Sequence, residues 1–211
     1  MKIAGYNWVG NYFRFWVTIL TSFLLLSGVV AAYTTGTYGS GAYGTCQYGA
    51  ACSISVSSNG SLSLNITPAA GGKCTIQSDS VSVLTDDTNG YTLTLNDSST
   101  STALTNGAST IPASGGTVAS PTAIAANTWG YRVDGLGGFG SGPTTSQTNI
   151  SPNGTLIAGI EASNQTADTI ATHSGAANPA VSTTVWYAVC ADTSVPSGSY
   201  SSQAVYTAVA N

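Results

Sequence analysis

Few residues in this chain have the types and spacing that catalysis needs. His173 is the only histidine, so a Ser-His-Asp triad would have to use it, but no GxSxG nucleophile motif occurs. Glu161 is the only glutamate, and it could pair with Asp134 or Asp168 as the two carboxylates of a glycoside hydrolase. These residues leave a secreted hydrolase as an alternative. Because they do not form a complete catalytic constellation, we do not expect an enzyme.

Two other stretches match ligand-binding patterns. Asp86, Asp87 and Asn89 offer oxygen ligands suited to Ca²⁺, but the same residues are typical of a plain turn, which we prefer. Residues 135–140, GLGGFG, have the spelling of a dinucleotide-binding GxGxxG motif. No helix follows them and no βαβ unit surrounds them, so we expect a flexible loop there and no cofactor.

Charge excludes several classes of partner. Charged residues make up 6% of the chain, against about 25% in an average soluble protein. After residue 32 the only cations are Lys73 and Arg132, against eight acids, a net charge of −6. Binding to nucleic acid needs several cations to neutralise phosphates, so we expect no nucleic-acid partner. Arg132 and Asp134, two apart on an expected strand, are predicted to form a modest surface ion pair.

The first 32 residues have the pattern of a targeting segment. An apolar run spans residues 15–30, with Lys2 and Arg14 before it and Ala31-Ala32 after it. We expect a hydrophobic helix that serves as a signal peptide or, if uncleaved, as a membrane anchor through residues 15–32. In both cases the rest of the chain lies outside the cytoplasm, extracellular or at the cell surface.

Residues 33–52 form a lead-in rich in tyrosine and glycine. Tyr33, Tyr38, Tyr43 and Tyr48 recur every five residues, a spacing that fits neither a helix nor a strand. We interpret this segment as a flexible lead-in. The alternative is a ligand contact, because tyrosine rings stack on sugars and on one another.

Residues 53–211 have the pattern of one all-β domain. Apolar residues alternate with polar ones, as in strands with one buried face. The clearest sets are Leu62, Leu64 and Ile66; Tyr91, Leu93 and Leu95; and Trp129, Tyr131 and Val133. Residues 183–191 are more continuously apolar than the other runs, as a strand covered on both faces would be. The pattern predicts an antiparallel two-sheet sandwich, Ig-like or jelly-roll-like, after the N-terminal helix.

Turn signals divide the strands. Asn59-Gly60 predicts a hairpin between the first two runs, and Gly90 supplies a positive φ before the run that starts at Tyr91. Three long excursions remain, which we expect to be loops: residues 97–128, 134–154 and 161–182. Loops of this length often carry the function of a sandwich.

Four cysteines in an exported chain predict disulfides. Three pairings exist, and we favour Cys46–Cys52 as a local loop with Cys74–Cys190 as a long-range bridge. Both Cys74 and Cys190 lie in strand-like runs near Trp186, so we expect an inter-sheet bridge packed on an aromatic ring. A four-cysteine zinc site would need paired CxxC spacing, which is absent.

Four stretches of the sequence are distinctive: TYGSGAYGTCQYG, SDSVSVLTDDTNGYTLTL, NTWGYRVDG and TTVWYAVCADTSVPSGSYSSQAVYTAVAN. They resemble a group of uncharacterised secreted proteins of Saccharibacteria and related Patescibacteria. Within the last stretch, PSGSYSSQAVYTA is also similar to the closing strand of WxL-type bacterial surface domains. The Trp-x-Leu motif itself is missing, because Trp129 is followed by Gly-Tyr and Trp186 by Tyr-Ala. The resemblance implies a surface-exposed protein of a host-dependent bacterium, and it implies no particular ligand.

These observations together favour a non-enzymatic exported module of the cell surface or the secreted fraction. Adhesion or assembly into a surface filament is the expected role, with host or envelope glycans, proteins or further copies of the chain as partners. A carbohydrate-binding module that uses exposed Tyr and Trp is the first alternative, and the secreted hydrolase is the second.

Overall fold

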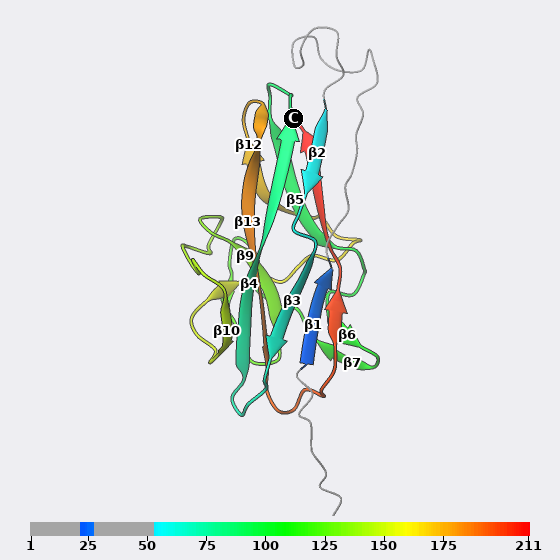
Figure 1. Cartoon of the computed structure of the whole chain (residues 1–211), viewed down its shortest axis with the longest axis vertical. Coiled ribbons are helices and arrows are strands. Elements are labelled where there is room, and N and C mark those ends of the chain that lie inside the picture. The colour runs from blue at the N-terminus through cyan, green and yellow to red at the C-terminus, as the bar shows by residue number, and fades with distance from the viewer. Residues whose placement is uncertain (1–21, 28–52) are drawn as a thin grey trace, which may run out of the picture.

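The computed structural model describes residues 22–27 and 53–211. This part of the chain is all-β, as the alternating pattern predicted, and elongated (Figure 1). The first strands are β1 (Ser22–Ser27), β2 (Ile54–Ser57), β3 (Ser61–Ile66), β4 (Lys73–Thr85) and β5 (Tyr91–Asp97). Short strands follow: β6 (Leu104–Asn106), β7 (Ser109–Ile111), β8 (Thr122–Ala123), β9 (Trp129–Val133), β10 (Gln147–Ile150) and β11 (Leu156–Ile157). The last are β12 (Asp168–His173), β13 (Ala177–Ala191), β14 (Tyr200–Ser202) and β15 (Ala204–Ala210).

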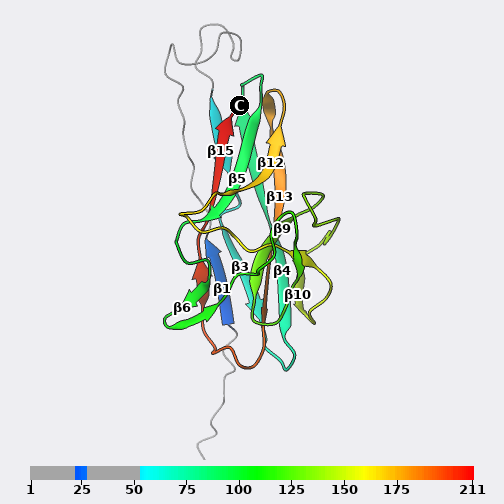
Figure 2. The ribbon, with the colours of Figure 1, turned by 180° about the vertical axis from the view of Figure 1, so that it is seen from behind.

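The strands form several sheets whose ladders are mostly antiparallel. The central sheet has the order β10-β4-β13-β9, with β2 also paired to β4. A second sheet has the order β3-β1-β14-β6-β7, a third has the order β12-β5-β15, and β11 pairs with β8. Figures 1 and 2 place β1 and β6 along one half of the long β4–β13 pair, and β5, β12 and β15 along the other half.

The pairing of β4 with β13 is the longest ladder. It runs in register from Val181 opposite Val83 to Ala191 opposite Lys73. Val185 to Ala191 are all buried, although side chains alternate between the two faces of a strand. The prediction of a strand covered on both faces is therefore confirmed for this part of the chain.

Each face of the central sheet contributes to a separate apolar cluster. The main core joins three sheets through residues such as Leu64 of β3, Val83 of β4 and Leu93 of β5. A smaller cluster lies on the other face, where Ile124 and Ile157 from the short-strand region pack with others. Its remaining buried members are Cys74, Ile76, Trp186, Ala188 and Cys190.

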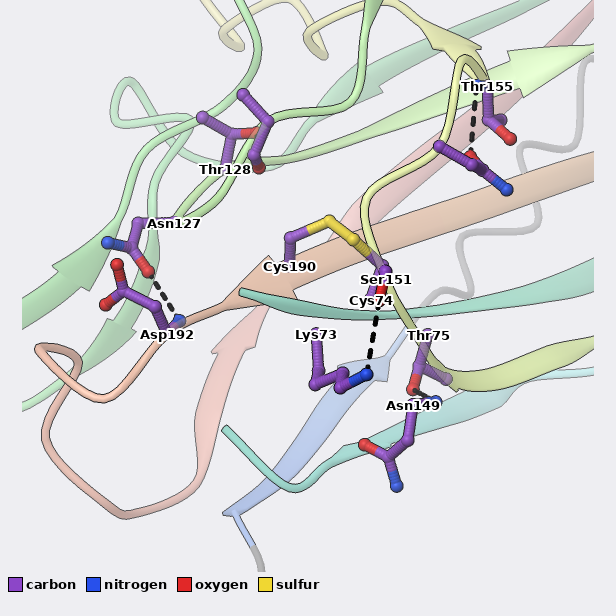
Figure 3. The surroundings of a disulfide bond; sticks show 12 residues. Lys73, Cys74, Thr75, Asn127, Thr128, Asn149, Ser151, Thr155, Cys190 and Asp192 are labelled. Atoms are coloured by element: carbon purple, nitrogen blue, oxygen red, sulfur yellow. Dashed lines mark hydrogen bonds between the residues drawn. A yellow bond between two sulfur atoms is a disulfide. The ribbon is translucent and has the colours of Figure 1, made fainter. Parts of the chain in front are cut away.

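The bridge between Cys74 and Cys190 is present, as predicted (Figure 3). The expected inter-sheet position is wrong, because the two cysteines lie directly opposite each other on neighbouring strands β4 and β13. The aromatic neighbour is right, since Trp186 belongs to the same buried cluster. A disulfide fits an oxidising environment of the kind that exported proteins meet.

The backbone conformation predicted at Gly60 and Gly90 is confirmed, but the turn at Asn59-Gly60 does not form a hairpin. Gly60 has φ +86° and Gly90 has φ +88°, the left-handed region that favours glycine. The hairpin predicted at Asn59-Gly60 is wrong, because β2 pairs with β4 while β3 pairs with β1. The turn carries the chain from one sheet to another, and the Asp79 carboxylate accepts a hydrogen bond from the Asn59 amide at 2.9 Å.

The three long excursions are not plain loops. The first holds β6, β7 and β8, the second holds β10, and the third holds β12 and the start of β13. In the N-terminal region, Ser22–Ser27 form strand β1 within the segment expected to be a helix, and the helix is not confirmed. Cys46, Cys52 and the tyrosines at 33, 38, 43 and 48 lie outside the described residues.

Removal of the disulfide should lower the free energy of unfolding by about 4–5 kcal/mol, because the bridge closes a loop with a sequence separation of 116. The test is chemical denaturation of the Cys74→Ala/Cys190→Ala double variant. Unmodified protein in a reductant is the control, and it should lose a similar amount. A loss below about 1 kcal/mol in both samples would contradict this account.

A second prediction compares two glycines with the same backbone conformation. A Cβ at Gly90 would lie 1.8 Å from the His173 carbonyl oxygen, whereas a Cβ at Gly60 would meet no described atom within 4 Å. We expect Gly60→Ala to cost about 1–2 kcal/mol from backbone strain alone, and Gly90→Ala to cost several kcal/mol more. Equal losses of unfolding free energy in Gly60→Ala and Gly90→Ala would contradict this account, because they would show that the contact between Gly90 and the His173 carbonyl does not affect stability.

Candidate functional site

The strongest candidate site is the position that β1 occupies between β3 and β14. β1 pairs antiparallel with β3 over six residues, from Ser22 opposite Ile66 to Ser27 opposite Ser61. Its other edge pairs in parallel with the three residues of β14, where Leu24 lies opposite Tyr200. We call the space between β3 and β14 the strand slot.

The walls of the strand slot are backbone edges above an apolar floor. Leu64 and Ile66 of β3 and Tyr200 of β14 are buried in the main core. The Tyr200 hydroxyl donates a hydrogen bond to the Pro196 carbonyl at 2.9 Å, which satisfies its polar end. Such a slot can bind an extended segment by main-chain hydrogen bonds, while alternate side-chain positions provide selectivity.

A polar recess of about 250 Å³ lies on the other side of β14. Its lining is rich in hydroxyls: Asp97, Ser98, Ser99, Ser101, Ala103, Thr105, Ser201, Ser202 and Gln203. Asp97 is fully buried, and its carboxylate accepts hydrogen bonds from the Ser99 amide and the Ser202 hydroxyl. These bonds join β5 to β14, so the carboxylate serves the packing of two sheets.

Two of the residues considered for hydrolysis, His173 and Asp168, contact structural partners. His173 ends β12, and its ring stacks on Tyr91 with 5.7 Å between the centroids. The Tyr131 hydroxyl donates to the Asp168 carboxylate at 2.6 Å. Burial, this hydrogen bond and the negative charges of Asp168 and Glu161 raise the pKa of Tyr131, so the phenol stays a proton donor.

The pair of Arg132 and Asp134 is confirmed, with 2.9 Å between Arg132 Nη2 and Asp134 Oδ1. Its expected surface position holds for Asp134, whose side chain is 37% exposed, and is wrong for Arg132, whose side chain is only 3% exposed. The guanidinium also donates to the carbonyl oxygens of Leu156, Phe139 and Gly140. The glycine-rich stretch that spells GxGxxG thus wraps around an arginine.

The residues considered for Ca²⁺ take part in a turn. The Asp86 carboxylate accepts a hydrogen bond from the Ser53 amide at 2.7 Å. The Asp87 carboxylate accepts one from the Asn89 amide at 2.8 Å. Across residues 53–211 and 22–27, no group of three or more His, Cys, Asp or Glu side chains is placed to hold a metal ion.

The Tyr, Trp and Phe rings between residues 53 and 211 are all buried. They are Tyr91, Trp129, Tyr131, Phe139, Trp186, Tyr187, Tyr200 and Tyr206. A carbohydrate-binding surface needs exposed rings on which sugars stack. Within residues 53–211, therefore, the aromatic side chains serve the core and offer no such surface.

A buried polar pair was not predicted from the sequence. The hydroxyls of Tyr187 on β13 and Tyr206 on β15 lie 2.7 Å apart and join the central sheet to the third sheet. Burial raises the pKa of both phenols, and the nearby negative charge of Asp79 raises them further. The sequence signals only that both residues lie at inward positions of strands.

Comparison with known proteins gives no relative from which a function could be inferred. No protein-family model matches the chain. No curated protein matches it either. No helix in the described residues has the length and apolarity to cross a membrane.

The Tyr187–Tyr206 pair predicts a coupling that a double-mutant cycle can measure. Tyr187→Phe and Tyr206→Phe should each cost about 1–2 kcal/mol, because each removes the hydrogen bond between the two buried hydroxyls. The double variant should cost less than the sum of the two single variants. Strict additivity in denaturant unfolding would contradict the hydrogen bond.

The same pair predicts loss of stability in alkali. A phenol whose pKa is raised in the folded state contributes its full stability below the unfolded pKa of about 10, and loses it as the pH rises above that value. The free energy of unfolding should fall above pH 10 by up to about 1.4 kcal/mol per pH unit for each such tyrosine. The slope should be smaller in the Tyr187→Phe/Tyr206→Phe variant.

Proposed function

We propose that this chain is a non-enzymatic exported β-sandwich module that acts by assembly or adhesion at the cell surface or outside the cell. The observation that carries the proposal is the place of β1. A strand separated from β2 by residues 28–53 completes a sheet between β3 and β14. Proteins that assemble through added strands need such an acceptor position.

In the proposed sandwich, one layer is the central sheet and the other layer is formed by the second and third sheets. These two sheets follow each other along the chain, because β14 ends at Ser202 and β15 begins at Ala204. The main core contains buried residues from all three sheets, such as Val81, Leu95 and Tyr200. This common core supports two facing layers rather than separate domains.

The extracellular or surface location is supported by the cysteines and the composition. The Cys74–Cys190 bridge is expected in an oxidising compartment. The N-terminal apolar segment with its flanking positive charges favours export. A net charge of −6 after residue 32 argues against binding to nucleic acid or to anionic lipid.

A non-enzymatic role is supported by the partners of the polar groups. Asp168 is bound to Tyr131, Asp134 to Arg132, and Asp97 to Ser202. Each carboxylate therefore has a structural task. Of the alternatives, a carbohydrate-binding module would depend on the tyrosine-rich lead-in, since the rings between residues 53 and 211 are buried. A hydrolase would depend on Glu161.

The test is export of the full chain from a bacterial host, followed by mass measurement by light scattering and electron microscopy of the exported material. We expect assemblies larger than a monomer, and we expect Glu161→Gln to leave both assembly and any background glycan hydrolysis unchanged. A monomeric product that hydrolyses a polysaccharide, with activity lost by at least about 100-fold in Glu161→Gln, would overturn the proposal in favour of the hydrolase.

A further inference from the structure

We propose that the strand slot binds a second copy of this chain, and that Ser22–Ser27 of one copy fill the slot of the next. This inference rests on the proposed function and names the partner and the contact through which assembly occurs. It requires that Ser22–Ser27 remain on the exported chain and outside the membrane, in place of the cleaved or membrane-embedded fate that the sequence predicts for residues 1–32. It follows from the two ladders of β1, from the way β1 is connected to the rest of the chain, and from the match between the strand and the slot.

The slot is incomplete without β1. In the described sheet order, β1 is the neighbour that links β3 to β14, and β14 otherwise pairs with β6. Without β1, the six residues of β3 and the three of β14 would present unpaired main-chain groups beside an apolar core. Unpaired edges of this kind are templates for a strand from another chain.

The connectivity of β1 does not tie it to its own domain. β1 forms no hairpin with either neighbour. It runs parallel to β14, and residues 28–60 separate it from its antiparallel partner β3. The 26 residues 28–53 connect it to β2. That stretch can reach about 90 Å when extended, whereas β13, the longest strand, has 15 residues and spans about 50 Å.

The sequence of β1 matches the slot in register. Leu24 lies opposite Leu64, and Leu26 lies opposite Leu62. Leu64 is buried, and Leu62 packs against the same core. Apolar positions of the strand are therefore paired with apolar positions of the slot, while Leu25 lies opposite Ser63. Because β1 contains Phe23 and three consecutive leucines, a shift by one residue would also pair apolar positions, so the register is the one that the backbone ladder defines.

The same contacts form whether the strand comes from the same copy or from another. Local concentration then decides between them, since a tethered strand competes at an effective concentration in the millimolar range. Copies crowded on a surface reach conditions in which strands pass from one copy to the next. Each copy would give one strand and receive one, a head-to-tail contact that generates an open filament when its rotation does not close into a ring.

The experiment uses cysteine pairs at the register position of Leu25 and Ser63, because residues directly opposite on antiparallel strands are close enough for a disulfide. One full-length chain carries Leu25→Cys and a differently tagged full-length chain carries Ser63→Cys. The two are exported together, oxidised and analysed on non-reducing gels with mass spectrometry of the linked peptides. We expect a covalent product that contains both tags, linked at positions 25 and 63.

The matched control replaces Ser63→Cys with Val209→Cys, an exposed position on β15 in another sheet, and should give no mixed-tag product. A single chain that carries both Leu25→Cys and Ser63→Cys measures the pairing of β1 with β3 within one copy. The proposal would be overturned if this doubly substituted chain forms its internal cross-link while the two tagged chains give no mixed-tag product, because β1 would then pair only with β3 of its own copy. Absence of both products, or exported chains that lack residues 22–27, would overturn it as well.

These outcomes separate the inference from the proposed function. Large exported assemblies without the mixed-tag product would leave assembly in place and remove the strand slot as its contact. A second variant, Leu24→Pro, tests the same contact without oxidation, because proline removes a main-chain donor from the ladder and is excluded from a central strand. It should reduce the average assembly mass by at least about 10-fold, while Val209→Pro on the edge strand β15 controls for a general effect of proline.

Discussion

The antiparallel ladder between β4 and β13 is the interaction on which the rest of the structure depends. It is the longest pairing, it carries the disulfide at one end, and it has an apolar cluster on each face. The second and third sheets pack along successive halves of it (Figure 2). Burial on both faces explains why β13 changes from exposed and alternating at its start to fully buried from Val185 onward.

Polar groups inside this fold hold elements together. Arg132 gathers carbonyls of the glycine-rich stretch, Asp97 joins β5 to β14, and the Tyr187–Tyr206 pair links two sheets. Buried groups of this kind are costly unless each has its partner, and here the partners come from the chain itself. The unusual feature is the second sheet, whose continuity depends on a strand from the N-terminal region. The proposed function accordingly depends on strand exchange and not on side-chain chemistry.

The sequence allowed us to predict the strands, which depend on local patterns. It did not allow us to predict which strands are neighbours in a sheet. The alternation around Leu64 and Leu93 identified strands, and the even cysteine count with strand-like surroundings identified the Cys74–Cys190 bridge. The neighbour relation of β4 and β13 has no local signal, so the bridge was placed between sheets. The continuous apolar run that contains Ser22–Ser27 has no period to distinguish strand from helix. The strand slot was invisible for the same reason, because it is made by residues far apart in the chain.

The covalent bridge also decides how the molecule responds to mechanical load. Tension between the two ends of the chain would pass from β3 into Cys74 and then directly across the sulfurs to Cys190 and on to β14. The intervening residues, with a sequence separation of 116 and roughly 400 Å of contour length, lie outside that path and cannot be drawn out. Only the short outer strands would yield. A fibre built from such units would stretch little before its links break, and each unit would keep its folded centre while oxidised.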